Sequence, residues 1–124
     1  GLAFSNTKTA IAHNLSYPIT LNYGIQHGIA CSFTLPIITR SMIGVDKLAE
    51  ERLQLIFNDN LENGSSKLNE FMRSLEVPLN LNEIKVPVQE WSNIVNDAFL
   101  GERGKNFIGN KVAFTASAKS MGLY

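Results

Sequence analysis

The chain contains two histidines, His13 and His27, and both lie within its first 39 residues. Neutral imidazole is a common ligand of divalent metal ions, and it can also transfer protons near neutral pH. Lys8 is the only fully charged residue from Gly1 to Thr39, so this segment is too poor in charge for an ordinary solvated surface. We therefore expect the segment to be mostly buried and to bring the two imidazoles together as metal ligands.

Two other interpretations of the histidines stay open. In the first, each ring is a packed core residue that bonds main-chain carbonyls. The chain would then be a non-catalytic helical interaction domain whose uncharged N-terminal face binds a protein partner. In the second, His27 and Cys31 form half of a structural zinc site. That site needs two more soft ligands and only His13 is available, so it ranks lowest.

The remaining composition excludes several classes of function. The sequence contains no CxxC, HExxH or GxSxG motif and no glycine-rich phosphate loop. Eleven basic residues balance eleven acidic ones, which argues against nucleic-acid and anionic-membrane partners. Pro18, Gly24 and Gly28 interrupt the apolar segment and argue against a membrane span. The single cysteine and the lack of a recognisable signal peptide predict a cytoplasmic protein.

Helical periodicity predicts the elements that position the histidines. We expect a first helix from Ser5 or Asn6, as the N-cap, to about Tyr17, because Pro18 should end it. Within that helix His13 and Tyr17 are four residues apart and share one face.

A second helix is expected over residues 27–40, with Pro36 kinking it or ending its first part. Gly28 would permit a close backbone approach beside His27.

The rest of the chain also reads as helical. Further helices are expected over 45–58 with Asp46 near its start, after Asn63-Gly64-Ser65 as far as Val77, over 87–99 and over 111–121. The first three of these carry an apolar stripe, and Trp91 and the Phe71-Met72 pair lie on such stripes and are interpreted as core residues. Residues 79–86 show a hint of strand alternation and are interpreted as an extended connector. Five to six helices without a confident strand predict an all-α bundle, and 124 residues suit one domain.

A composite motif surrounds the histidines: Ala3-Phe4-Ser5-Asn6, His13, Tyr17-Pro18, His27-Gly28-Ile29-Ala30 and Leu35-Pro36. It closely resembles the metal-site region of iron-containing (group III) alcohol dehydrogenases. In that family two histidines fourteen positions apart ligate a divalent ion, and His13 and His27 have this separation. The motif spans about forty residues and is fairly specific. Weaker similarity covers the remainder of the chain.

The resemblance implies that residues 1–124 are the C-terminal metal-binding helical half of a two-domain dehydrogenase. The cofactors would be Fe2+, or Zn2+ as a substitute, and NAD or NADP bound mainly by the missing N-terminal domain. The substrate would be a small alcohol or aldehyde, and the protein could form a homo-oligomer. The missing N-terminal domain would also supply an aspartate and a third histidine as metal ligands. The chain alone should therefore bind metal poorly and be inactive.

Two positions depart from the family pattern. Gln26 stands where the family generally has proline before the second ligand, and Tyr17 stands where it commonly has a further histidine near the nicotinamide. A phenol can still donate a hydrogen bond or help transfer a proton, so Tyr17 is predicted to be catalytic by orienting the substrate oxygen. The stretch Leu-Ser-Tyr-Pro-Ile-Thr is similar to the branch that contains phosphonoacetaldehyde reductases.

Overall fold

The first described helix, α2 (Ile11–Tyr23), carries His13. The computed structural model describes residues 8–124, so the predicted N-cap at Ser5 or Asn6 lies outside the described residues. Residues 8–10 are not helical, and the helix therefore begins later than the sequence predicted.

The prediction that Pro18 ends this helix is wrong, because α2 continues through it to Tyr23. An interior proline removes one main-chain hydrogen bond and costs about 3 kcal/mol. Complete burial of an aliphatic side chain stabilises by about 1.5–3 kcal/mol. Beyond the proline, α2 buries Ile19 fully and packs Tyr23 partly against the core. Tertiary burial thus offsets the local cost of the proline.

The predicted helix over residues 27–40 is two helices, α3 (His27–Ser32) and α4 (Leu35–Ser41). The break comes just before Pro36, which lies in the first turn of α4, so the prediction that Pro36 ends the first part is confirmed. Between α2 and α3, Gly24 is in the left-handed region with φ +68 and donates its N–H to the carbonyl of Thr20. This turn reverses the chain and packs α3 against α2.

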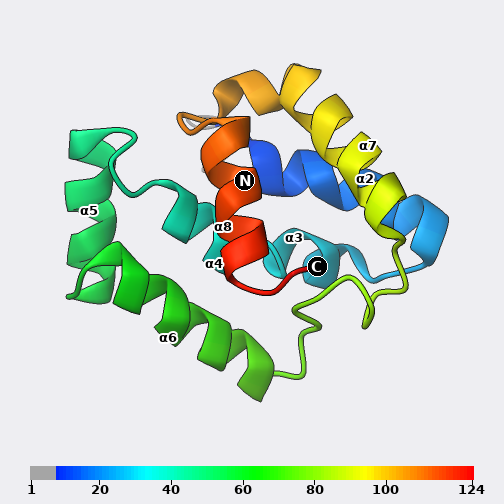
Figure 1. Ribbon diagram of the computed structural model, residues 1–124, viewed down its shortest axis with the longest axis horizontal. Coiled ribbons are helices and arrows are strands. Elements are labelled where there is room, and N and C mark those ends of the chain that lie inside the picture. The colour runs from blue at the N-terminus through cyan, green and yellow to red at the C-terminus, as the bar shows by residue number, and fades with distance from the viewer. Residues whose placement is uncertain (1–7) are drawn as a thin grey trace.

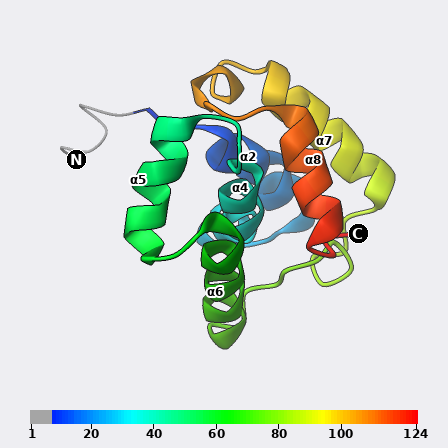
Figure 2. The same cartoon turned by 60° about the vertical axis from the view of Figure 1, so that its left-hand side comes forward.

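Helix α5 (Lys47–Phe57) begins as predicted, because Asp46 accepts a hydrogen bond of 2.8 Å from the N–H of Ala49. Its apolar residues are mostly exposed, however. Leu55 is 81% exposed and Ile56 is 74% exposed, so the predicted apolar stripe does not face the described core. Figures 1 and 2 show α5 on one side of the molecule, away from α7.

Helix α6 (Leu61–Ser74) begins earlier than predicted, and Asn63-Gly64 lies inside it. Asn60 caps it by accepting from the N–H of Asn63. A Cβ on Gly64 would lie 2.7 Å from the ring of Phe57, so glycine permits the close contact between α5 and α6. Met72 is buried as expected from the apolar stripe of this helix.

Two other residues of the predicted α6 stripe are not in the core. Phe71 is 56% exposed and Leu75 is 58% exposed, so the prediction that the Phe71-Met72 pair is core holds only for Met72. The buried face of α6 instead runs through Leu61, Gly64 and Ser65.

Residues 79–86 form turns and not the extended connector that the sequence predicted. The N–H of Leu81 donates to the carbonyl of Leu123, and that of Val86 donates to the carbonyl of Leu81. These bonds fold the segment back on itself and bury Leu79, Leu81, Ile84 and Val86.

The C-terminal part consists of α7 (Val88–Leu100), the short 3-10 helix η1 (Gly104–Asn106) and α8 (Lys111–Ser120). The predicted core position of Trp91 is confirmed, because its side chain is 2% exposed and its ring contacts those of Phe33 and Phe114.

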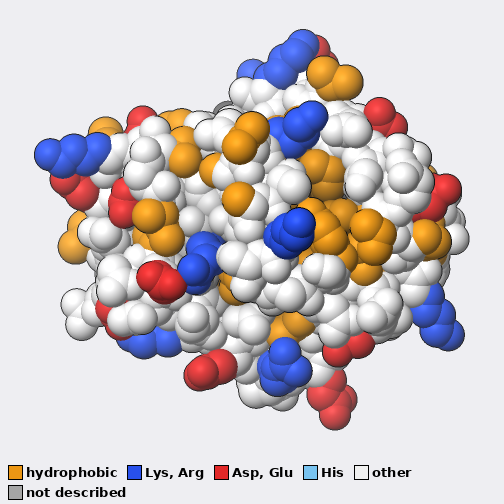
Figure 3. Space-filling view, in the orientation of Figure 1, with side chains coloured by type: hydrophobic (Ala, Val, Ile, Leu, Met, Phe, Trp, Pro, Cys, Tyr) orange, Lys and Arg blue, Asp and Glu red, His pale blue; other side chains and the backbone are white. Residues whose placement is uncertain are grey.

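The described chain contains helices, turns and irregular segments, so the all-α prediction is confirmed. None of its described helices is long and apolar enough to cross a membrane. Figure 3 shows basic and acidic side chains interspersed over one face.

Candidate metal centre

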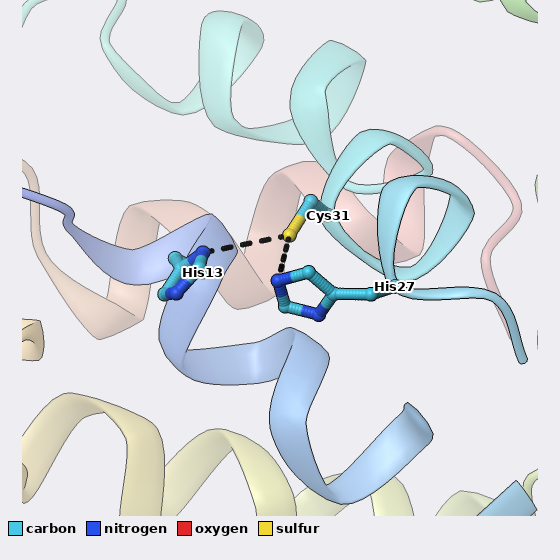
Figure 4. A group of neighbouring side chains, drawn as sticks. All are labelled: His13, His27 and Cys31. Atoms are coloured by element: carbon cyan, nitrogen blue, oxygen red, sulfur yellow. Dashed lines mark hydrogen bonds between the residues drawn. The ribbon is translucent and has the colours of Figure 1, made fainter. Parts of the chain in front are cut away.

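The structure brings His13 and His27 together, with ring centroids 4.9 Å apart and ring planes at 84°. His13 projects from α2, and His27 is the first residue of α3 (Figure 4). The Gly24 turn between the two helices makes this meeting possible. The hydrogen bonds of both rings go to side chains of residues 8–124, and none goes to a main-chain carbonyl. This geometry argues against two independently packed core histidines.

Tyr17 contacts His13 as their spacing on one helix predicts. The phenol oxygen lies 2.8 Å from Nε2 of His13, and the two rings meet edge to face. The guanidinium carbon of Arg103 lies 4.9 Å from the centroid of the Tyr17 ring, within cation–π range. Arg103 belongs to the loop after α7. No sequence pattern in this loop indicates that Arg103 reaches the site.

Ser16 favours the tautomer of His27 that carries its proton on Nδ1. Its buried hydroxyl donates to the main-chain oxygen of His13 at 2.7 Å, and its oxygen lies 3.4 Å from Nδ1 of His27. Because the serine proton is already used, Ser16 can only accept a hydrogen bond from Nδ1–H. The lone pair of neutral His27 is then on Nε2.

Cys31 completes the cluster. Its sulfur lies 3.6 Å from Nδ1 of His13 and 3.6 Å from Nε2 of His27. Together the sulfur and one nitrogen from each histidine lie within 4.8 Å of one another. Cys31 follows His27 by four residues in α3, which explains why both face the same way.

The electrostatic environment favours neutral His13. Partial burial lowers the pKa of His13 below its ordinary value of 6.5, and the nearby His27 and Arg103 lower it further. A neutral ring offers a nitrogen lone pair without first losing a proton. His13 can therefore offer a lone pair to a metal ion near neutral pH.

A pocket of about 350 Å³ adjoins His13 and Cys31. The rest of its lining is mostly small or apolar, consisting of Thr9, Ala10, Ile11, Ala12, Ser32, Leu35, Ile38 and Phe107. Such a lining can hold a small apolar group.

Other expected features lie away from the cluster. A Cβ on Gly28 would meet nothing within 4 Å among the described residues, so the predicted close approach there is wrong. Two lysines of the C-terminal part have other polar partners, because Lys105 pairs with Glu102 and Lys111 donates to the side chain of Asn96. The His13–His27 segment is also less buried than predicted, since His27 itself is exposed.

The donor atoms suit a divalent transition-metal ion. Imidazole nitrogen binds Fe2+ and Zn2+, and thiolate sulfur prefers softer ions such as Zn2+. The residues therefore fit such an ion.

Comparison with known proteins identifies a family. The family model described as Fe-containing alcohol dehydrogenase family, C-terminal, matches residues 1–116. No curated protein and no solved structure matches the chain.

Proposed function

Since the chain belongs to the Fe-containing alcohol dehydrogenase family, whose C-terminal part it matches, we propose that it is the metal-binding helical domain of an NAD(P)-dependent alcohol dehydrogenase or aldehyde reductase. In this proposal His13 and His27 hold Fe2+, or Zn2+ as a substitute. The observation that carries it is the 4.9 Å separation of two imidazoles that have no main-chain partner among the described residues.

When bound, the ion would act as a Lewis acid that polarises the substrate oxygen during hydride exchange with the nicotinamide. The chain would contribute the two imidazoles and the pocket beside them. Because the pocket lining is mostly apolar, it would pack against the apolar part of a small substrate.

Tyr17 is proposed to orient the substrate oxygen. If His13 offers Nδ1 to the ion, its Nε2 carries the proton and donates to the phenol oxygen 2.8 Å away. Tyr17 then has its own hydroxyl proton available for another acceptor. A substrate oxygen next to the ion would be such an acceptor, which suits a general acid.

The position of Arg103 favours an alcohol or aldehyde substrate that also carries an anionic group. Its guanidinium lies over the Tyr17 ring, and it forms no ion pair with any carboxylate of residues 8–124. Guanidinium binds phosphate and carboxylate groups in a bidentate manner. This position fits the expected similarity to phosphonoacetaldehyde reductases. Arg103→Ala should then raise KM for an anionic aldehyde and leave KM for a neutral one unchanged.

The remaining parts of the proposal concern the protein beyond this chain. An N-terminal domain would bind NAD or NADP and supply further metal ligands. The cytoplasmic location and a homo-oligomeric state remain predictions.

The direct test is metal retention by the protein that joins this chain to its proposed N-terminal domain. His13→Ala or His27→Ala should abolish retention of the ion and dehydrogenase activity, because each removes a ligand. Asn22→Ala is the matched control, since Asn22 is an exposed residue of the same helix α2. Near-stoichiometric metal in either purified histidine variant would refute the proposal.

A further inference from the structure

We propose that Cys31 is a third protein ligand, so that His13, His27 and Cys31 bind a zinc-like divalent cation within this chain alone. The inference rests on the proposed function, because it uses the same two imidazoles. It goes further by adding a ligand and by predicting a preference for a soft ion. It also reverses the expectation that the chain by itself binds metal poorly.

The two nitrogen–sulfur distances match those of a tetrahedral site. Zn2+ lies about 2.0–2.1 Å from histidine nitrogen and about 2.3 Å from cysteine sulfur. In a tetrahedron these bond lengths place nitrogen and sulfur about 3.5 Å apart. Both nitrogen–sulfur distances in the cluster are 3.6 Å. The three donor atoms lie within 4.8 Å of one another, whereas two nitrogens of such a tetrahedron lie about 3.3 Å apart, so the two rings would also move closer together to admit an ion.

The second nitrogen of each ring already has a partner. Nε2 of His13 contacts Tyr17, which leaves Nδ1 facing the sulfur. Nδ1 of His27 contacts Ser16, which leaves Nε2 facing the sulfur. Metal-bound histidines usually have such a partner on the nitrogen away from the ion, because it selects the tautomer and holds the ring in place.

Simple packing explains this arrangement less well. A thiol has one proton and can donate it to only one of the two nitrogens. Binding of a divalent ion would replace that proton: the sulfur loses H+ to solvent, and two nitrogen lone pairs and the thiolate each form one bond to the ion. The fourth position would stay open for substrate oxygen or for a ligand from the N-terminal domain.

The site can be tested with Co2+, which replaces Zn2+ and gives spectra that report its ligands. Folded 1–124 chain, checked by far-ultraviolet circular dichroism, is titrated with Co2+ and then with Zn2+. We expect one equivalent to bind with a sulfur-to-cobalt charge-transfer band and the release of one proton. Zn2+ should displace Co2+ and should protect Cys31, the single thiol, from alkylation.

Cys31→Ser should remove the charge-transfer band and weaken Co2+ binding by at least about tenfold. Loss of a residue that only hydrogen-bonds to a metal ligand already lowers metal affinity by about 10–100-fold, and loss of a ligand should lower it at least as much. Ser32→Ala is the matched control, because the hydroxyl of this neighbour donates its proton to the carbonyl of Gly28. It should keep both the band and the affinity.

The outcomes separate this inference from the proposed function. In one outcome, His13→Ala releases the ion from the two-domain protein while the 1–124 chain shows no charge-transfer band. That pair of results would overturn the role of Cys31 and leave the proposed function intact. Equal Co2+ affinity for wild type and Cys31→Ser would do the same. Near-stoichiometric metal in either histidine variant of the two-domain protein would overturn the proposed function and this inference with it.

Discussion

Replacing Ser16 by alanine should change the tautomer of His27 while leaving the fold intact. Ser16 is fully buried in α2, donates to the main-chain oxygen of His13 and lies 3.4 Å from Nδ1 of His27. Alanine removes the acceptor that favours a proton on Nδ1. More molecules should then carry the proton on Nε2, the nitrogen that faces Cys31.

The length of the Ser16–His27 contact sets the size of the effect. A neutral hydrogen bond contributes about 0.5–1.5 kcal/mol. The Ser16–His27 bond is long, so we place its contribution at about 0.5–1 kcal/mol. Such a change shifts the tautomer ratio about two- to fivefold in favour of Nε2–H. Metal affinity should fall by up to the same factor, because only the Nδ1–H form presents a lone pair to the ion. Stability should change by less than about 1 kcal/mol, since alanine also favours the helix.

Nitrogen-15 NMR of the metal-free chain measures the tautomer directly, and with only two histidines the assignment is simple. Co2+ titration of the same samples measures the affinity, and urea unfolding measures the stability. Ser32→Ala is the control, because it loses a comparable bond to a main-chain carbonyl without contact to an imidazole. Unchanged nitrogen shifts of His27 in Ser16→Ala would refute the reasoning, whatever the affinity.

Four other contacts lead to further predictions. Tyr17→Phe in the two-domain protein should lower kcat by about 100-fold or more with metal content unchanged, because it removes a proposed proton donor; steady-state kinetics with metal analysis checks this. Gly104→Ala should destabilise the chain by at least about 1–3 kcal/mol in urea unfolding, since its Cβ would lie 2.1 Å from a main-chain oxygen. Gly28→Ala, in open space on a helix, should instead be neutral or stabilise by up to about 1 kcal/mol. Asp59→Asn tests a pH effect: the hydrogen bond from Lys67 is the main cause of the lowered pKa of Asp59, so the charged form stabilises the fold. That contribution is present above the ordinary pKa of 3.8 and is lost as pH falls through the lower folded value. The variant should therefore melt below wild type at neutral pH, and the difference in Tm should vanish in acid; a constant difference would contradict this.

The sequence was sufficient for features that depend on neighbours along one helix. The apolar period of 3.6 residues predicted the all-α fold, and the four-residue spacing placed Tyr17 beside His13 and Cys31 on the same face as His27. Local capping also gave the start of α5 at Asp46. These features involve short-range geometry, which a residue's own neighbours determine.

Local signals failed where distant packing outweighed them. Pro18 should stop a helix, yet burial of Ile19 beyond it carries α2 onward. An apolar period says which residues share a face but not what covers that face. The exposed Leu55 and Phe71 show that such a stripe does not always meet the described core.

The sequence by itself determined the all-helical class and the presence of two imidazoles fourteen residues apart. Only the tertiary structure decided that Cys31 lies 3.6 Å from both rings and that Ser16 orients one of them. It also decided that Arg103 approaches from a loop almost ninety residues away. The physical reason is that these contacts depend on the left-handed turn at Gly24 and on how α2, α3 and α7 pack, and no local pattern encodes the distance between separate helices.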